Sequence, residues 1–359
     1  MTERVEIDLT EMSRYLSEVF KTSAKVETVR KLGTGVLGSA FLVQATLNEQ
    51  NRSMVLKIAK GTGFGQDYPA DRAATLIYAN SVYNKLPRHV KSFDVGAITK
   101  RGSLKSLGGS EDFFILMEYV QGKDYAADLD EIAKRRELLP TDKDKACLLA
   151  EYEASIHKVR KDQPELYIRS IRDLLGRGDC ISGIIDSYPQ DERTYSFTAD
   201  AEFETIEKKC VEWRWKLRKM THRLSQVHGD LHPFNILWQG PREFTLLDRS
   251  RGEWGEPADD VASLSINYIF WSLSAYGSLQ GPFEELFRLF IDRYLELTND
   301  TELLEVLQLF YAFRTLVIAN PIFYPSLGVE NRRRLFNFMN AVLNSERFNP
   351  REVNSYLKG

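Results

Sequence analysis

The sequence changes its periodicity near Gly122, and this change constrains the fold more than any other feature. Upstream, helical patterns at 9–20 and 70–86 accompany short β-prone runs at 25–32, 39–47, 53–60 and 112–120. Downstream, long amphipathic helical patterns occupy 142–161, 281–297 and 335–343. We therefore expect an α+β, two-lobed fold. Its small antiparallel β lobe covers residues 1–118, and its large, mostly helical lobe covers 119–359. Residues 162–200 are weakly patterned, and we expect a flexible insertion there.

Three glycines, Gly33, Gly35 and Gly38, form a GxGxxG pattern in "LGTGVLGSAFLV". A dinucleotide fingerprint needs a strand before the glycines and a helix after them. Here a β-prone run stands on both sides, so the glycines are expected to cap a β-hairpin. Such a hairpin is either a plain turn or a flap whose backbone N–H groups cover nucleotide phosphates.

Lys57 lies between apolar residues in the β-prone run "MVLKIAK". A lysine that faces inward from a strand is costly to bury unless it meets an anion. It therefore either alternates outward to solvent or neutralises the α- and β-phosphates of a nucleotide.

The stretch HGDLHPFN, residues 228–235, has two interpretations. His228, Asp230 and His232 alternate with period two, so on a strand they would share one face and could bind zinc. That interpretation leaves Asn235 and the later Asp248 without a role. It also places a proline in a central strand.

The second interpretation is a phosphotransferase loop, and it gives each of these residues a role. Asp230 would accept or orient the proton of a substrate hydroxyl as this attacks the γ-phosphate of ATP. Asn235 and Asp248 would hold Mg²⁺, a hard cation that prefers oxygen ligands. We predict Asp230 as the catalytic residue, Asn235 and Asp248 as the metal ligands, and ATP and Mg²⁺ as the cofactors.

These motifs resemble the aminoglycoside phosphotransferase and choline kinase family, whose members have the protein-kinase-like fold. The family pattern H-G-D-x-x-x-x-N is matched from His228 to Asn235, and its metal-binding aspartate is matched by Asp248. The resemblance covers roughly residues 25–275. It implies a bilobal kinase-like fold in which the N-terminal lobe binds the nucleotide.

The resemblance also implies supporting roles for three further residues. "GEPADDVA" matches a family segment whose second acidic position falls on Asp260, a structural residue expected to cap a helix and brace the catalytic loop. "LLAEYEASIH" matches a family helix that ends at His157, which we expect to be a packed or capping histidine. His228 is expected to bond the backbone around the loop rather than to act in the chemistry.

Two features depart from the family pattern. Kinase-like folds pair the strand lysine with a helix glutamate, but residues 67–87 contain none. Asn80 or Ser81 falls near the expected position, and Asp71 or Asp67 could serve if the helix is shifted. Arginines follow Asp248 in "DRSRGEWG".

We expect Arg249 and Arg251 to pair with Glu253, Glu256 or Asp260. The alternative is that one of them faces the γ-phosphate or an anionic substrate.

The run "FFILMEYVQG" is typical of the hinge that contacts the adenine in this fold. We predict that Glu118, Tyr119 and Val120 pass the base, and that Glu118 and Val120 bind it. Side chains at such positions do not separate ATP from GTP.

Composition excludes some partners. The net charge of −3 provides no basic field for nucleic acid. The N-terminus lacks the apolar core of a signal peptide, and no uncharged apolar run reaches the roughly 18 residues of a membrane span. Three widely spaced cysteines fit reduced thiols. We expect a cytoplasmic protein without nucleic-acid or membrane partners, and the sequence leaves its oligomeric state open.

The favoured function is phosphate transfer to a small-molecule hydroxyl of an aminoglycoside-, choline- or sugar-like acceptor. Aromatics in the helical lobe, such as Trp213, Trp215, Trp254, Tyr268 and Trp271, either cage or stack on such an acceptor or form the core. A protein Ser/Thr kinase is the first alternative, although no A-P-E segment is evident and little room separates Asp248 from Asp260. A nucleotide-binding pseudokinase scaffold is the second, supported by the missing helix glutamate.

Overall fold

The computed structural model describes residues 7–35, 37–60, 69–105 and 112–358. The chain divides into two compact units. One unit comprises Met1–Gln121 and Thr245–Ser250, and the other comprises Gly122–Phe244 and Arg251–Gly359. The return of a short segment to the first unit is not apparent from the sequence pattern.

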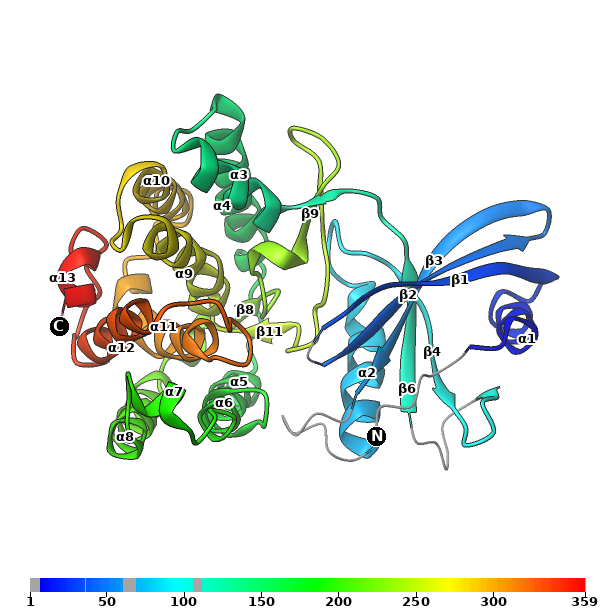
Figure 1. The fold of residues 1–359 in the computed structure, drawn as a ribbon, viewed down its shortest axis with the longest axis horizontal. Coiled ribbons are helices and arrows are strands. Elements are labelled where there is room, and N and C mark those ends of the chain that lie inside the picture. Colours follow the sequence, from blue (N-terminus) through cyan, green and yellow to red (C-terminus); the bar gives the residue numbers. More distant parts are fainter. Residues whose placement is uncertain (1–6, 36, 61–68, 106–111, 359) are drawn as a thin grey trace. The chain divides into compact units, whose positions relative to one another are not determined.

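The first unit is built on a six-stranded antiparallel sheet with the strand order β1-β2-β3-β6-β4-β5 (Figure 1). Its elements are α1 (Leu9–Phe20), β1 (Ala24–Thr34), β2 (Gly38–Leu47), β3 (Gln50–Ala59), α2 (Pro69–Tyr83), β4 (Ser92–Ile98), β5 (Leu104–Lys105) and β6 (Asp112–Glu118). The first helix and the strands β1, β2, β3 and β6 lie where the periodicity predicts them. Strands β4 and β5 were not predicted.

Helices α1 and α2 cover opposite faces of this sheet. Along β6, Phe114 and Leu116 belong to the apolar core that includes α1, whereas Ile115 belongs to the core beneath α2. This alternation follows from the period of two along a strand. Lys57 on β3 is directly opposite Ile115, so its side chain lies on the α2 face. Its neighbours Leu56 and Ile58 point into the α1 core.

The second unit is mostly helical, and α9 (Pro257–Tyr276) is buried along nearly its whole length. It packs against α10 and α11 (Figure 1). The other helices are α3 (Tyr125–Arg135), α4 (Pro140–His157), α5 (Pro164–Gly176), α6 (Ile181–Asp186), α7 (Glu192–Tyr195), α8 (Asp200–Leu217), α10 (Gly281–Thr298), α11 (Leu303–Ala319), α12 (Val329–Leu343) and α13 (Val353–Lys358), with short 3₁₀ turns η1 (Thr221–Arg223) and η2 (Pro233–Asn235). The short strands of this unit are β7 (Lys123–Asp124), β8 (Ser225–Gln226), β9 (Ile236–Trp238) and β11 (Trp254–Gly255). Strand β10 (Phe244–Leu246) begins in this unit at Phe244 and continues into the short segment of the first unit. These two units confirm the expected α+β architecture.

The expectation of a flexible insertion at 162–200 is wrong, because this region forms α5, α6 and α7. Tyr167, Ile171 and Leu174 of α5 are buried. Their spacing of four and three residues is a helical period, but it is short and interrupted by charged residues, which weakened the pattern.

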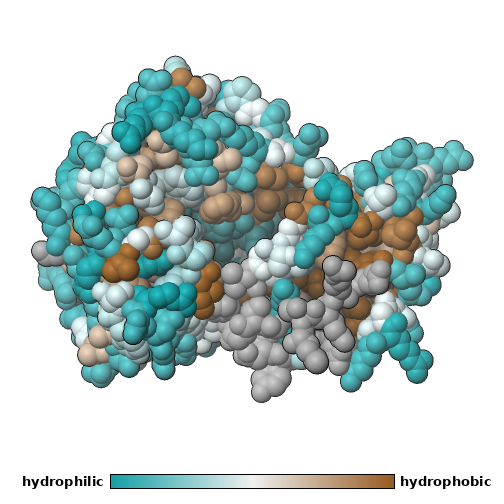
Figure 2. All heavy atoms as spheres, in the orientation of Figure 1, coloured by the Kyte–Doolittle hydropathy of each residue, from teal (hydrophilic) through white to brown (hydrophobic). Residues whose placement is uncertain are grey.

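Among the described residues, no helix is both long enough and apolar enough to cross a bilayer. The face of the helical unit drawn in Figure 2 is largely hydrophilic, with apolar residues in small separate patches.

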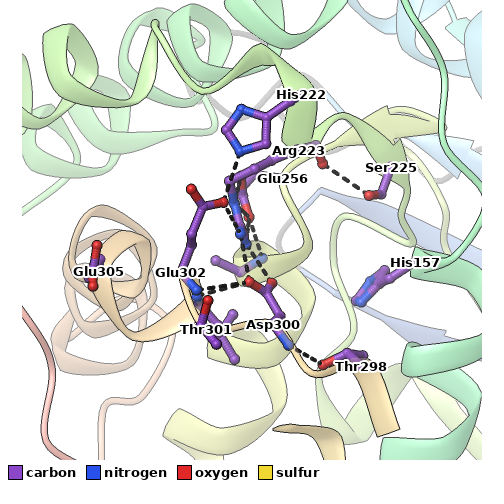
Figure 3. Close-up of polar contacts among 12 residues, drawn as sticks. His157, His222, Arg223, Ser225, Glu256, Thr298, Asp300, Thr301, Glu302 and Glu305 are labelled. Carbon is purple, nitrogen blue, oxygen red and sulfur yellow. Dashed lines mark hydrogen bonds and ion pairs between the residues drawn. The ribbon is translucent and has the colours of Figure 1, made fainter.

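A buried ion network connects the 3₁₀ turn η1 to α9 and to the turn before α11 (Figure 3). Arg223 is 2% exposed and donates from Nη2 to Oε1 of Glu256 at 2.7 Å, and from Nη1 to Oδ1 of Asp300 at 2.7 Å. Glu256 is the N-cap of α9 and accepts from the hydroxyl of Tyr167 at 2.7 Å. Nη1 of Arg223 also lies 3.2 Å from Oε2 of Glu302. A guanidinium in contact with three carboxylates has the geometry that compensates for the desolvation of a buried charge.

We predict that Arg223→Gln lowers the free energy of unfolding by about 3–5 kcal/mol, because it leaves Glu256 buried without its cation. Urea unfolding followed by circular dichroism measures the change. The matched control is Arg193→Gln, which removes an exposed ion pair with Asp191 and should cost about 0–1 kcal/mol. Equal losses in the two variants would contradict the prediction.

Candidate active site

The loop at 228–232 is irregular, and Pro233–Asn235 forms the 3₁₀ turn η2. The zinc interpretation required a strand here, and among the described residues no cluster of His, Cys, Asp or Glu is arranged to hold a metal. His228 also uses its Nδ1 to accept from the backbone N–H of Asp230 at 3.3 Å. The zinc interpretation is therefore wrong.

Asp260 fixes the backbone of this loop through hydrogen bonds. Its carboxylate accepts from the N–H groups of His228 and Gly229, each at 2.7 Å, and contacts Nε2 of His157 at 3.2 Å. Burial opposes its charge, but the hydrogen bond from His157 and the nearby His228 outweigh it and hold the Asp260 pKa below its ordinary value. Asp260 thus supports the loop, as expected. The expectation that it also caps a helix is wrong, because the N-cap of α9 is Glu256.

Gly229 allows this geometry. Its φ is +83°, a region that side chains rarely adopt. A Cβ at this position would also lie 3.2 Å from Cβ of Arg251. The H-G-D spacing thus reflects a backbone turn that needs glycine between the scaffold histidine and the aspartate.

Asp230 is held by two arginines. Its Oδ1 accepts from Nη1 of Arg314, and Nε of Arg251 lies 3.5 Å from its Oδ2. Burial raises the pKa of Asp230, but the charges of Arg251 and Arg314 outweigh this and hold it well below its ordinary value. Asp230 is therefore a carboxylate at neutral pH. Arg314 was not found by sequence reasoning, because it lies 84 residues away with no local motif.

The arginines after Asp248 have different partners from those expected. Arg251 contacts Asp230, the Oδ2 of Asp179 at 3.7 Å and the Sγ of Cys180 at 3.2 Å, so its expected pairing with Glu253, Glu256 or Asp260 is wrong. Arg249 is fully buried and donates to the carbonyl of Val82 at 3.3 Å.

Asn235 is oriented by its neighbours. Its Nδ2 donates to the backbone carbonyl of Asp230 at 2.9 Å and lies 3.1 Å from Nε2 of His232. Because the amide nitrogen is committed to these acceptors, Oδ1 is the atom directed elsewhere. An amide oxygen is a suitable ligand for a hard cation such as Mg²⁺. The chemistry of Asn235 therefore fits its predicted role as one of the two metal ligands.

The first unit holds the predicted cation and the second predicted metal ligand. Nζ of Lys57 lies 2.8 Å from Oδ2 of Asp248, and both side chains are about 30% exposed. Lys57 therefore meets an anion, the carboxylate of Asp248, while its contact with nucleotide phosphates stays a prediction. Asp248 has φ +54°, and a non-glycine residue in this region costs roughly 1–3 kcal/mol, a strain that concentrates at functional sites.

The helix residues proposed to replace the missing glutamate have other roles where they are described. Oδ1 of Asn80 accepts from the hydroxyl of Ser92 at 2.5 Å, and the hydroxyl of Ser81 donates to the carbonyl of Tyr78 at 2.7 Å. Asp67 lies outside the described residues, as does the side chain of Asp71. Among the described residues, the ion pair of Lys57 is with Asp248.

The glycine pattern caps the β1–β2 hairpin, as the flanking strands predict. Gly35 donates its N–H to the carbonyl of Gly38 at 2.9 Å, and Gly33 has open space where a side chain would be. A Cβ on Gly38 would clash with the carbonyl oxygen of Ile58 on β3. Close packing of β2 on β3 therefore explains Gly38 without a ligand, whereas Gly33 and Gly35 leave an uncovered backbone.

The two residues predicted to contact adenine lie at the end of β6 and just after it. Glu118 ends β6 and donates its N–H to the carbonyl of Lys91 at 2.8 Å. Val120 packs at the edge of the core beneath α2.

Most aromatics considered for an acceptor site belong to the core. Trp213, Tyr268 and Trp271 are buried, and the indole of Trp271 donates to Asp130 at 2.8 Å. Phe234, two residues after His232, is instead 48% exposed and stacks at a tilt against Trp271.

A model of the phosphotransferase enzyme family matches residues 28–279. No curated protein matches the chain. Among solved structures, a "putative fructosamine-3-kinase" from Haemophilus somnus is similar with a TM-score of 0.53 at 14% identity, covering 93% of this chain and 97% of that one. This likeness confirms the protein-kinase-like fold.

Two further structures are similar at lower scores. A Plasmodium vivax ethanolamine kinase has a TM-score of 0.49 at 15% identity, covering 93% of this chain and 81% of that one. An aminoglycoside phosphotransferase, APH(4)-Ia, in a ternary complex with AMP-PNP and hygromycin B, has a TM-score of 0.49 at 18% identity, covering 93% and 98%.

Glu153 of α4 carries a buried carboxyl group close to Asp260. It is fully buried, and no described residue donates to either of its oxygens. Burial, together with the charge of Asp260, raises its pKa well above the ordinary 4.5. Glu153 is therefore protonated in the folded protein over a pH range in which the unfolded chain has lost the proton.

We predict that Glu153 makes stability fall as the pH rises. Above about pH 4.5 the unfolded state binds fewer protons than the folded state, so the free energy of unfolding decreases until the folded pKa is passed. Glu153→Gln should remove this slope and raise the melting temperature more at pH 8 than at pH 5. Melting curves over this range test it, and an equal shift at both pH values would contradict it.

Proposed function

Because the chain belongs to the phosphotransferase enzyme family, we propose that it is an ATP- and Mg²⁺-dependent enzyme that phosphorylates a hydroxyl group of a small molecule. The observation that supports this most is the catalytic loop. Asp260 fixes its backbone, and Asp230 and Asn235 present a carboxylate and an amide oxygen of the kind that this reaction needs.

Asp230 would orient the acceptor. Its low pKa keeps the carboxylate ionised, so it accepts a hydrogen bond from the attacking hydroxyl. The acceptor oxygen bonds to the γ-phosphorus, the bond to the β,γ-bridging oxygen breaks, and ADP leaves. The hydroxyl proton passes to Asp230 and then to water. A weakly basic carboxylate suits a loose transition state, in which the proton leaves late.

Asn235 and Asp248 would hold Mg²⁺, through an amide oxygen and a carboxylate. The bound cation neutralises charge on the phosphate oxygens. Lys57 would bind the α- and β-phosphates with its ammonium group. The open backbone at Gly33 and Gly35 would cover the phosphates, together with Gly38, and the segment from Glu118 to Val120 would contact the adenine.

A small-molecule acceptor is favoured over a protein. In protein kinases a long activation segment after the metal aspartate binds the peptide. Here α9 begins at Pro257, nine residues after Asp248, and Trp254–Gly255 forms strand β11 in that interval. A pseudokinase is disfavoured because the predicted base and both predicted metal ligands are present.

We predict that γ-labelled ATP with Mg²⁺ transfers label to a metabolite of a cell extract with the wild type and not with Asp230→Asn. Loss of the general base should lower turnover by about 10²–10⁴-fold. Asp292→Asn, in an exposed ion pair with Arg351, is the control and should keep full activity. Label on proteins would favour the Ser/Thr kinase alternative. Equal turnover by wild type and Asp230→Asn would refute the proposed mechanism.

We further predict that Asn235→Ala raises the Mg²⁺ concentration needed for half-maximal ATP turnover by at least about tenfold. The reason is the loss of one oxygen ligand. Asn344→Ala, at the exposed end of α12, serves as the control. A Mg²⁺ titration identical to the wild type would show that Asn235 does not bind the metal.

A further inference from the structure

Arg314 lies in α11, outside the segment matched by the family model. It is 6% exposed, which is unusual for an arginine in the middle of a helix. A side chain of this kind is expected to be fully paired, because an unpaired buried charge is costly.

The guanidinium of Arg314 binds three acceptors on two different segments. Nη1 donates to the carboxylate of Asp230, and Nη2 donates to the carbonyl of Gly229 at 2.9 Å. Nε and Nη2 donate to Oδ1 of Asp259, on α9, at 3.2 and 2.6 Å. One planar fork therefore connects the catalytic loop to the first turn of α9.

Gly229 is consequently held on both sides. Its N–H is bound by Asp260, and its carbonyl is bound by Arg314. The peptide that precedes Asp230 cannot rotate without breaking one of these bonds. Arg314 thus fixes both the backbone and one carboxylate oxygen of the predicted catalytic residue.

The guanidinium group of Arg314 is also held in place by packing. The guanidinium carbons of Arg314 and Arg251 lie 4.8 and 4.9 Å from the ring centre of Phe313, which is fully buried. Stacking on an aromatic ring restricts the plane of a guanidinium. The arrangement is a rigid one, rather than a flexible surface ion pair.

We propose that Arg314 is a positioning residue for phosphate transfer: by binding Oδ1 of Asp230 and the carbonyl of Gly229, it fixes the carboxylate so that Oδ2 is presented to the acceptor hydroxyl. This inference rests on the proposed function, in which Asp230 contacts the acceptor. Arg314 acts through Asp230 and is not itself placed on the substrate or the nucleotide.

A positioning role has a consequence that a purely structural role lacks. Arg314→Gln should lower kcat by about 10²-fold, because a small displacement of a catalytic group has an effect of this size. The affinity for a fluorescent ADP analogue should stay unchanged. Arg314→Lys should also be impaired, because an ammonium keeps the charge but cannot reach all three acceptors.

The experiment measures ATP turnover in the metabolite fraction of a cell extract, and binding of the ADP analogue, for wild type, Asp230→Asn, Arg314→Gln and Arg314→Lys. Arg332→Gln is the matched control. Arg332 is also buried in the helical unit, but it donates to the carbonyls of Ala319 and Tyr324 rather than to the loop at 228–235. It should lose thermal stability and keep its turnover.

Loss of turnover with intact ADP binding in both Arg314 variants would support the inference. Wild-type turnover in Arg314→Gln or Arg314→Lys, beside an inactive Asp230→Asn, would overturn it and leave the proposed function standing. Equal turnover of Asp230→Asn and wild type would instead refute the proposed function.

The pairing is also tested without activity, through the melting temperatures of the single variants and of Asp230→Asn combined with Arg314→Gln. Losses smaller than the sum of the single effects would support the pair, and additive losses would overturn it.

Discussion

The proposed catalytic loop depends on one buried carboxylate, Asp260. The side chain of Asp260 is fully buried, and its carboxylate accepts from two consecutive backbone N–H groups and contacts His157. Such a charge is tolerated only where donors replace water, and two aligned peptides together with a histidine provide them. The turn at Gly229, with φ +83°, brings both N–H groups to the same carboxylate. The turn at Gly229 and the buried carboxylate of Asp260 therefore support each other.

Around Asp230 the charges alternate in sign from Asp259 to Arg314, Asp230, Arg251 and Asp179. Asp259 and Asp230 both contact Arg314, but their pKa values shift in opposite directions. Burial raises the pKa of Asp259, and the adjacent charge of Asp260 adds to this. Asp230 has a second cation in Arg251, which overcomes its burial. Asp230, on the proposed catalytic loop, is thus the carboxylate whose ionised form is favoured, whereas burial disfavours the ionised form of Asp259.

Local patterns predicted the parts of the molecule that local physics determines. The apolar period over 9–20, the strand runs around Gly33 and Lys57, and the spacing from His228 to Asn235 each depend on residues close in sequence. Arg314 and the partners of Arg251 could not be found in this way, since they depend on how α6, α9 and α11 approach the loop. Strand β5 has two residues, too few for any period, and α5 was obscured by charged residues between its apolar positions.

Lys57 has a different ion-pair partner from the one that the resembling fold leads us to expect. In the resembling fold a helix glutamate holds this lysine, but the described part of α2 offers none, and Asn80 is bound to Ser92. The carboxylate that meets Lys57 is Asp248, on a segment that returns to the first unit. Arg249, buried and bonded to Val82, anchors the backbone next to the strained φ of Asp248. Among the described residues, the residue proposed to bind the metal is therefore also the ion-pair partner of the proposed phosphate-binding lysine.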